Sequence, residues 1–160
     1  MRMAPKSAGG LRWYLLALAA FAADQATKVW AEEALADGWV EVTGFFNLVL
    51  LRNTGSAFSF LADAGGWQQI FFGAVAVGIS AALARIIWKH PAERLVACAC
   101  ALVIGGALGN LLDRLRLGGV TDFLDFHAGT LHWPAFNIAD SAIVLGVFLF
   151  LLSELRSGKK

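Results

Sequence analysis

The stretch VTDFLDFHAGTLHWPAFNIAD, Val120 to Asp140, decides how this chain is organised. It places acids beside segments that are otherwise suited to hydrocarbon: Asp122 and Asp125 follow one apolar segment, and Asp140 opens the next, SAIVLGVFLFLLS. An ionisable side chain costs free energy at such a place, so by default it marks a functional site. We take Asp122 and Asp140 as the candidate reactive pair.

The composition around this stretch is that of a membrane protein. Of the 160 residues, 58% are hydrophobic and 16% are charged, which is too apolar for a soluble domain with a polar exterior. The net charge of +1 provides no basic surface, so we expect no nucleic-acid partner. We interpret residues 1–160 as a single integral-membrane domain.

Four apolar segments predict four transmembrane helices, at about residues 11–30, 67–88, 95–112 and 136–155. The third has 18 uncharged residues, about 27 Å at ~1.5 Å per residue, against a hydrocarbon thickness of about 30 Å. The first resembles a cleaved signal peptide, but the polar residues that follow Ala23 continue its helical pattern, and we expect it to be retained. The predicted fold class is an all-α polytopic membrane protein with a small extracytoplasmic β element.

Lysine and arginine residues predict the orientation of these helices. Four of the 13 fall on the side of the acidic stretch, and nine fall on the other side: Arg2, Lys6, Arg12, Arg85, Lys89, Arg94, Arg156, Lys159 and Lys160. Both termini are therefore expected in the cytoplasm, with the acidic stretch facing outward.

Two outward connections are expected. The first, about residues 31–66, contains a run from Val40 to Phe60 that is rich in Val, Phe, Leu and Thr and broken at Gly44 and at Asn53-Thr54-Gly55. This pattern predicts strands and turns on the outer membrane surface. The second, about residues 113–135, is expected to be a loop that turns back toward the membrane at Gly129 and Pro134.

The chemistry of two close carboxylates favours proteolysis. Two acids that cannot both ionise share a proton, so one activates a water molecule while the other polarises a carbonyl group. Sequence spacing alone leaves other roles open for the same residues. Asp122 and Asp125 are also typical of surface loops, and Asp140 is also typical of a helix N-cap.

Seven further polar residues lie near the outward ends of different segments, so one site could gather them. Asp24 and Lys28, four apart on a helix, predict a structural ion pair. The others have capping, snorkelling or turn roles as alternatives; they are Asn53, Asn110, Asp113, Arg114 and Asn137.

Other chemistries find little support. His127 and His132 form only a weak metal pattern, and we predict no metal and no cofactor. Cys98 and Cys100 lie too far apart around a helix for a disulfide and are interpreted as packing residues. Gly105 and Gly109 form a GxxxG that predicts close helix packing.

Five blocks resemble the lipoprotein signal peptidases, the type II signal peptidases of bacteria, in their order and spacing. They are Asp24 to Lys28 (DQATK), Asn53 to Phe58 (NTGSAF), Gly106 to Arg114 (GALGNLLDR), Val120 to Phe123 (VTDF) and Phe136 to Ser141 (FNIADS). The resemblance implies an intramembrane aspartic protease of the inner membrane, with its active site near the periplasmic face. It would cut the signal peptide from a diacylglyceryl-modified prolipoprotein just before the lipidated cysteine.

The resemblance also assigns roles to residues. The catalytic pair maps to Asp122 and Asp140, with Asp122 preferred over the nearby Asp125. Pocket residues that bind substrate map to Asn53, Asn110, Arg114 and Asn137, and supporting roles fall to Asp24, Lys28, Gly55 and Asp113. The expected partners are prolipoprotein substrates and membrane lipid, and the enzyme is expected to be a monomer. The alternatives are a small proton-coupled transporter, in which intramembrane acids relay protons, and a structural assembly protein.

Overall fold

The structure is a computed structural model, and it describes residues 10–55 and 65–157. Several sequence predictions fall outside these residues. They are the strand signal beyond Gly55, the block residues Ser56 to Phe58, and the terminal charges Arg2, Lys6, Lys159 and Lys160.

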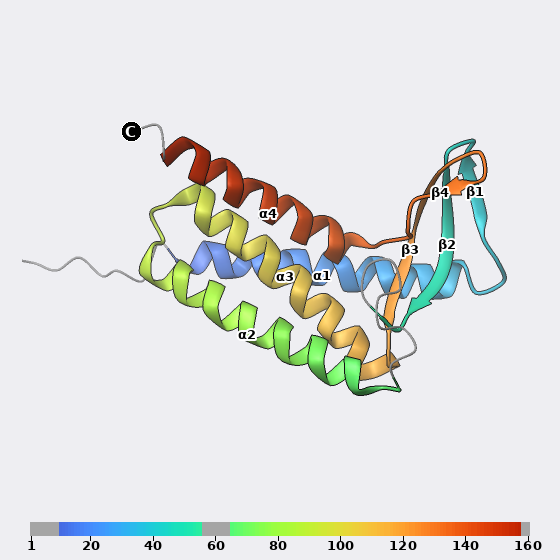
Figure 1. Ribbon diagram of the computed structural model, residues 1–160, viewed down its shortest axis with the longest axis horizontal. Helices are drawn as coiled ribbons and strands as arrows, with labels where there is room; N and C mark the ends of the chain where they lie inside the picture. The colour runs from blue at the N-terminus through green and yellow to red at the C-terminus, as the bar shows by residue number, and fades with distance from the viewer. Residues whose placement is uncertain (1–9, 56–64, 158–160) are drawn as a thin grey trace, which may run out of the picture.

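Four helices lie side by side: α1 (Leu11–Ala34), α2 (Trp67–Lys89), α3 (Arg94–Leu117) and α4 (Ile138–Ser157) (Figure 1). In the described part of the chain, three of them, α2, α3 and α4, are long and apolar enough to cross a membrane. The fourth, α1, falls short because Asp24, Gln25 and Lys28 lower its mean hydropathy. Three of the predicted spans therefore have the expected length and composition, and the fourth remains a prediction.

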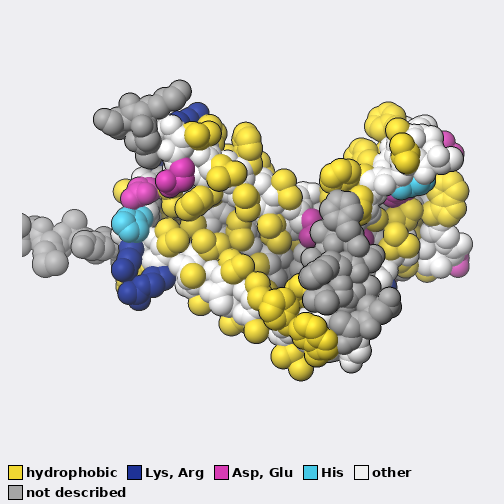
Figure 2. All heavy atoms as spheres, in the orientation of Figure 1, with side chains coloured by type: hydrophobic (Ala, Val, Ile, Leu, Met, Phe, Trp, Pro, Cys, Tyr) yellow, Lys and Arg dark blue, Asp and Glu magenta, His cyan; other side chains and the backbone are white. Residues whose placement is uncertain are grey.

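Helix α3 forms the centre of the bundle and contacts the other three helices. In the most apolar 18-residue stretch of each helix, 56% of the residues of α3 are buried, against 6% in α2 and 11% in α4. The outer helices instead expose Ile70, Val77, Val144 and Phe148, and Figure 2 shows apolar side chains over this face. Such an exterior suits lipid, because hydrocarbon solvates these side chains at no cost.

Small residues allow α3 to pack closely. The side-chain position of Gly105 lies against the backbone of α1, and that of Gly106 lies against the carbonyl of Ala139 on α4. Gly109 leaves space for the carboxylate of Asp24. The interpretation of Gly105 and Gly109 as close-packing residues is therefore confirmed.

Four strands form one antiparallel sheet in the order β1-β2-β3-β4: β1 (Val40–Thr43), β2 (Phe46–Asn53), β3 (Val120–Ala128) and β4 (Leu131–His132). The first two confirm the strands predicted near residue 40. The predicted β element is therefore present but larger than expected. Residues 113–135, predicted as a loop, instead contain the end of α3 and the strands β3 and β4. The local pattern of β3 contains charges, and it becomes a strand because it pairs with β2, which is distant in sequence.

The sheet extends away from the helices (Figure 1). Phe46 pairs with Phe126 and Asn47 pairs with Asp125, and successive side chains of a strand alternate between the faces. One face therefore carries the stacked rings of Phe46, Phe126 and Phe136, and the other carries Asn47 and Asp125. Figure 2 shows a notch between the sheet and α4, with acidic side chains at its base.

Candidate active site

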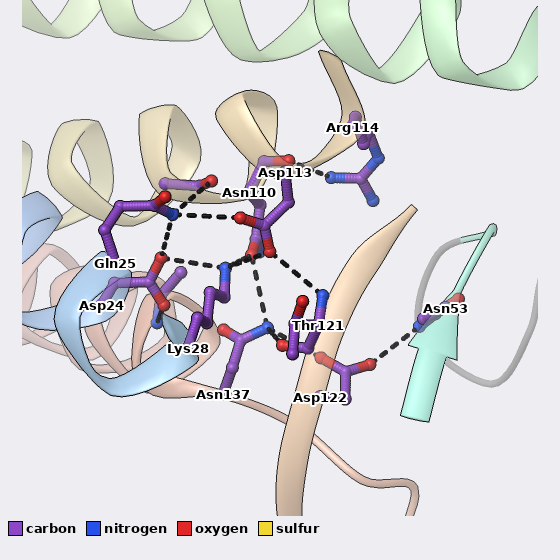
Figure 3. Close-up of polar contacts among 12 residues, drawn as sticks. Asp24, Gln25, Lys28, Asn53, Asn110, Asp113, Arg114, Thr121, Asp122 and Asn137 are labelled. Carbon is purple, nitrogen blue, oxygen red and sulfur yellow. Dashed lines mark hydrogen bonds and ion pairs between the residues drawn. The ribbon is translucent and has the colours of Figure 1, made fainter. Parts of the chain in front are cut away.

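Asp122 lies on β3 near the ends of α3 and α4. Its side chain is 3% exposed. The amide of Asn137 donates to one carboxylate oxygen at 2.7 Å, and the amide of Asn53, at the end of β2, donates to the other at 3.2 Å (Figure 3). Burial, and next the negative charge of Asp140, raise the pKa of Asp122 to about 7 against the opposing effect of the two amide hydrogen bonds. The carboxyl group therefore holds a proton up to neutral pH.

Asp140 lies in the first turn of α4, and Asn137 is the residue that precedes the helix. The backbone N–H of Asp140 donates to the side-chain oxygen of Asn137 at 2.9 Å, and the N–H of Asn137 donates back to Asp140 at 3.3 Å. This reciprocal pair has the geometry of a capping box. The alternative role of Asp140 at a helix start is thus compatible with a role in the site, with Asn137 as the capping residue.

Asn137 connects the two acids of the candidate pair. It is fully buried and contacts the carboxylate of Asp122 with its side chain and that of Asp140 with its backbone. The side-chain amide of Asn110 on α3 donates to the other oxygen of Asp140 at 2.8 Å. The two asparagines therefore set the positions of both carboxylates.

A buried ion cluster lies next to this pair. Lys28 contacts Asp24 and Asp113 at 2.9 Å each, and all three side chains are at most 2% exposed. Lys28 also donates to the side-chain oxygen of Asn110 at 2.8 Å. Because an ammonium group can only donate, this contact turns the amide nitrogen of Asn110 toward Asp140. The predicted Asp24–Lys28 pair is present, with Asp113 as a third member.

The ion cluster also fixes the two segments that carry the candidate pair. Asp24 accepts a hydrogen bond at 2.8 Å from the N–H of Ala139, at the start of α4. Asp113 accepts one at 3.0 Å from the N–H of Thr121, directly before Asp122. Each acid therefore holds the backbone next to one member of the pair.

Two contributors were missed from the sequence. The amide of Gln25 bridges Asp24 and Asp113 at 3.2 and 3.1 Å, and its position next to Asp24 was a usable signal. Thr121 is fully buried, and its hydroxyl group joins Glu32 on α1 to Arg52 on β2. Thr121 lies in the family block Val120 to Phe123, but no role was predicted for it, because all of these partners are distant along the chain.

Arg114 lies beside the site without an ion pair to either acid. Its guanidinium donates to the carbonyl group of Asn110 at 3.3 Å (Figure 3). It also donates to the carbonyl group of Gly55 at 3.1 Å and lies over the ring of Phe72. Its Nε is buried and unpartnered in the described part of the chain. The asparagines therefore make the hydrogen bonds to the acids, and Arg114 holds the turn at Gly55.

Asp125 faces away from the candidate pair, because three residues along a strand reverse the face. His132 and Asn47 contact its carboxylate, each at 2.9 Å. Burial alone would raise the pKa of Asp125, but these hydrogen bonds outweigh it and the pKa is lowered. Among the described residues, no group of three His, Cys, Asp or Glu side chains is arranged to hold a metal ion.

The fold and the site define a membrane enzyme that gathers buried acids and amides at one end of a helical bundle. The family model described as signal peptidase (SPase) II matches residues 16–156. This chain belongs to that family of aspartic peptidases. The alternative of a proton-coupled transporter is therefore set aside.

Named relatives agree with this assignment. The lipoprotein signal peptidase of Azoarcus sp. (strain BH72) is 53% identical over 150 residues, covering 93% of this chain and 85% of that protein. The lipoprotein signal peptidase of Aeromonas hydrophila is 51% identical over 154 residues, covering 94% and 92%. A solved bacterial membrane enzyme superposes with a TM-score of 0.81 at 32% identity, covering 93% of this chain and 92% of the other.

Proposed function

We propose that this signal peptidase cuts prolipoproteins with Asp122 and Asp140 as its catalytic pair. The observation that carries the proposal is that one buried residue, Asn137, contacts both carboxylates. The acids come from a strand and a helix that meet only in the folded protein. Asp125, the competing acid, lies on the opposite face of the sheet in a pair with His132.

The mechanism follows from the unequal surroundings of the two acids. Asp140 lies at the N-terminal end of α4, where the helix dipole favours negative charge, so it acts as the base that takes a proton from water. Asp122 carries the shared proton and donates it to the scissile carbonyl oxygen as the hydroxide attacks the carbon. Collapse of the tetrahedral intermediate then transfers a proton to the leaving amine, which releases the new N-terminus.

The substrate approaches through the notch between the sheet and α4 (Figure 2). Its signal helix and the acyl chains of the diacylglyceryl group stay in lipid, so the scissile bond before the lipidated cysteine reaches the acids at the membrane edge. Restriction to the membrane plane reduces the orientational search. Asn53 and Arg114 lie at the rim of the site and supply hydrogen bonds to the substrate backbone.

All four helices cross the inner membrane in this proposal, and both termini are cytoplasmic. Helix α1 is 24 residues long, packs along α3, and buries its polar residues in the ion cluster, so its lower hydropathy does not prevent insertion. Arg12, Arg85, Lys89 and Arg94 lie at the helix ends away from the sheet, as cytoplasmic residues would. The enzyme acts as a monomer in this proposal.

Cleavage assays on single variants test the catalytic pair. Asp122→Asn and Asp140→Asn are each expected to abolish release of the signal peptide from a diacylglyceryl-modified prolipoprotein, while membrane insertion is retained. Asp125→Asn is the matched control and should keep activity, because its carboxylate faces away from the pair. Loss of activity in Asp125→Asn with activity retained in Asp122→Asn would overturn the assignment.

A further inference from the structure

The face of the sheet opposite Asp122 holds a cleft of about 420 Å³ that the proposed reaction does not use. Its floor is a row of side chains across three strands, since Glu41 pairs with Asn47 and Asn47 pairs with Asp125. The remaining walls are formed by Trp39, Val49, His127, Gly129 and His132. Figure 2 shows histidine and acidic side chains together at this end of the sheet.

The cleft presents buried polar atoms that have no hydrogen-bond partner among the described residues, and at least one of them, the side-chain oxygen of Asn47, is an acceptor. Asn47 is 6% exposed, and its amide nitrogen is committed to the carboxylate of Asp125 at 2.9 Å. That contact fixes the orientation of the amide, because a carboxylate can only accept. The side-chain oxygen of Asn47 and both ring nitrogens of His127 are buried and have no partner in the described residues. Unpaired buried groups of this kind cost free energy, so a ligand that satisfies them is favoured.

The charge of the cleft indicates which kind of ligand would bind there. Glu41 and Asp125 are both acidic, and the described residues that line the cleft include no Lys or Arg. Trp39 is 63% exposed at one wall and offers an aromatic face to a cation. The described side chains do not form a metal-binding group. An organic cation with N–H donors matches these features better than a metal ion.

We propose that this cleft binds the lysine or arginine side chain of a polypeptide on the aqueous side of the membrane. The opposite face of the sheet carries the stacked rings of Phe46, Phe126 and Phe136, which suit the lipid surface. The cleft therefore points away from the bilayer, so a peptide reaches it more readily than a lipid headgroup. The cationic nitrogen donates to the oxygen of Asn47 and is stabilised by Glu41 and Asp125.

The three histidines of the chain provide the readout. His127 and His132 line the cleft, whereas His90 lies between α2 and α3 at the far end of the bundle and serves as an internal reference. The full chain in detergent is labelled at histidine and titrated with N-acetyl-lysine amide, with N-acetyl-arginine amide and with neutral N-acetyl-norleucine amide. Histidine ring resonances are followed by NMR.

The two basic probes are expected to shift the His127 and His132 resonances in a saturable manner and to leave His90 unchanged. Glu41→Gln should weaken binding about threefold to fivefold, the size expected of an exposed ion pair. Glu154→Gln removes the same charge at the other end of α4 and should leave the affinity unchanged. Asn47→Ala, with its fold checked by its unfolding temperature, should weaken binding further.

Three results would overturn the proposal. The first is the absence of saturable shifts with the basic probes, or equal shifts with the norleucine probe. The second is a shift of the His127 and His132 resonances that appears when the chain is reconstituted into phosphatidylethanolamine bilayers but not into phosphatidylcholine bilayers. That result would assign the cleft to a lipid headgroup. The third is tighter binding of Zn²⁺ than of either probe, which assigns it to a metal.

Discussion

At the scale of single residues, the site depends on amide side chains whose orientations are imposed by their neighbours. Lys28 requires the oxygen of Asn110, and the carboxylate of Asp122 requires the nitrogen of Asn137. Each asparagine then presents its remaining groups to a fixed partner. The positions of both acids therefore follow from a chain of donors and acceptors that begins at a buried cation.

The raised pKa of Asp122 predicts how activity depends on pH. Since this pKa is raised to about 7, Asp122 loses its proton as the pH rises through neutrality and can no longer act as the proposed general acid. We expect kcat/KM to fall about tenfold per pH unit above about pH 7.5. Rates measured from pH 6 to 9 on one lipidated substrate check this, and a flat profile up to pH 9 would contradict it.

The stability of the folded protein should also depend on pH through the pKa of Asp122. The folded pKa of Asp122 lies above the value of about 3.9 for an exposed aspartate, so the protonated form is favoured by folding. This contribution is complete below about pH 4 and is lost as the pH rises through about 7. Between pH 5 and pH 8, the unfolding temperature of Asp122→Asn should therefore decrease less than that of the wild-type chain.

Lys28 is expected to matter most for stability among the buried residues. Lys28→Met leaves the carboxylates of Asp24 and Asp113 buried without a cation, which typically costs about 3–5 kcal/mol. Denaturation in detergent should show this loss, together with reduced cleavage. Arg116→Met, at an exposed position on α3, is the control and should stay close to wild type.

At the scale of elements, close packing of α3 against α1 makes the buried ion cluster possible. A methyl group at Gly109 would collide with the carboxylate of Asp24. Gly109→Ala should therefore lower the unfolding temperature and reduce cleavage at least tenfold, because Asp24 must move away from Lys28 and the start of α4. Loss of stability comparable to a large-to-small core change is expected, about 2 kcal/mol or more.

A second glycine provides the comparison for that experiment. Gly78 on α2 has nothing within 4 Å of its side-chain position and faces outward. Gly78→Ala should be neutral or slightly stabilising, because alanine has the higher helix propensity. Equal losses in both variants would show that glycine itself, rather than the space beside Asp24, is required in these helices.

The alternation of β3 separates two acids that are chemically alike. Asp122 faces the helices and Asp125 faces the cleft, although only three positions separate them. Their pKa values consequently move in opposite directions, upward for Asp122 and downward for Asp125. A shift of one residue in the pairing with β2 would exchange the faces on which the two acids lie, so the register of the sheet decides which of them can join the proposed catalytic pair.

At the scale of the whole molecule, the sheet and the α2–α3 connection lie at opposite ends of the helices (Figure 1). The proposed topology predicts that an impermeant thiol reagent labels Thr130→Cys from outside intact cells. Lys89→Cys should be labelled only after the membrane is permeabilised. Both are made in a Cys98→Ala, Cys100→Ala background, and the reverse labelling pattern would invert the topology.

The sequence specified much of this protein because its strongest signals are local. Runs of apolar residues bounded helices α2 and α4 to within a few residues, and strand residues near Val40 were recognisable from their composition. The family blocks identified the candidate residues, including Asn137 and Asn110. The strand at residues 120–128 was missed, because its charged pattern is stable as a strand only when β2 supplies the hydrogen-bonding edge.

Apolar runs and charge placement therefore indicated by themselves a membrane protein with acids at one end, and the resemblance of five sequence blocks to a known family indicated a peptidase and the residues that merit attention. Only the tertiary structure decided how those residues are joined. It placed Lys28 between two acids, put Asn137 between Asp122 and Asp140, and turned Asp125 to the far face of the sheet. The physical reason is that side-chain hydrogen bonds depend on distances of a few tenths of an ångström between segments far apart in the chain, and these distances are set by packing.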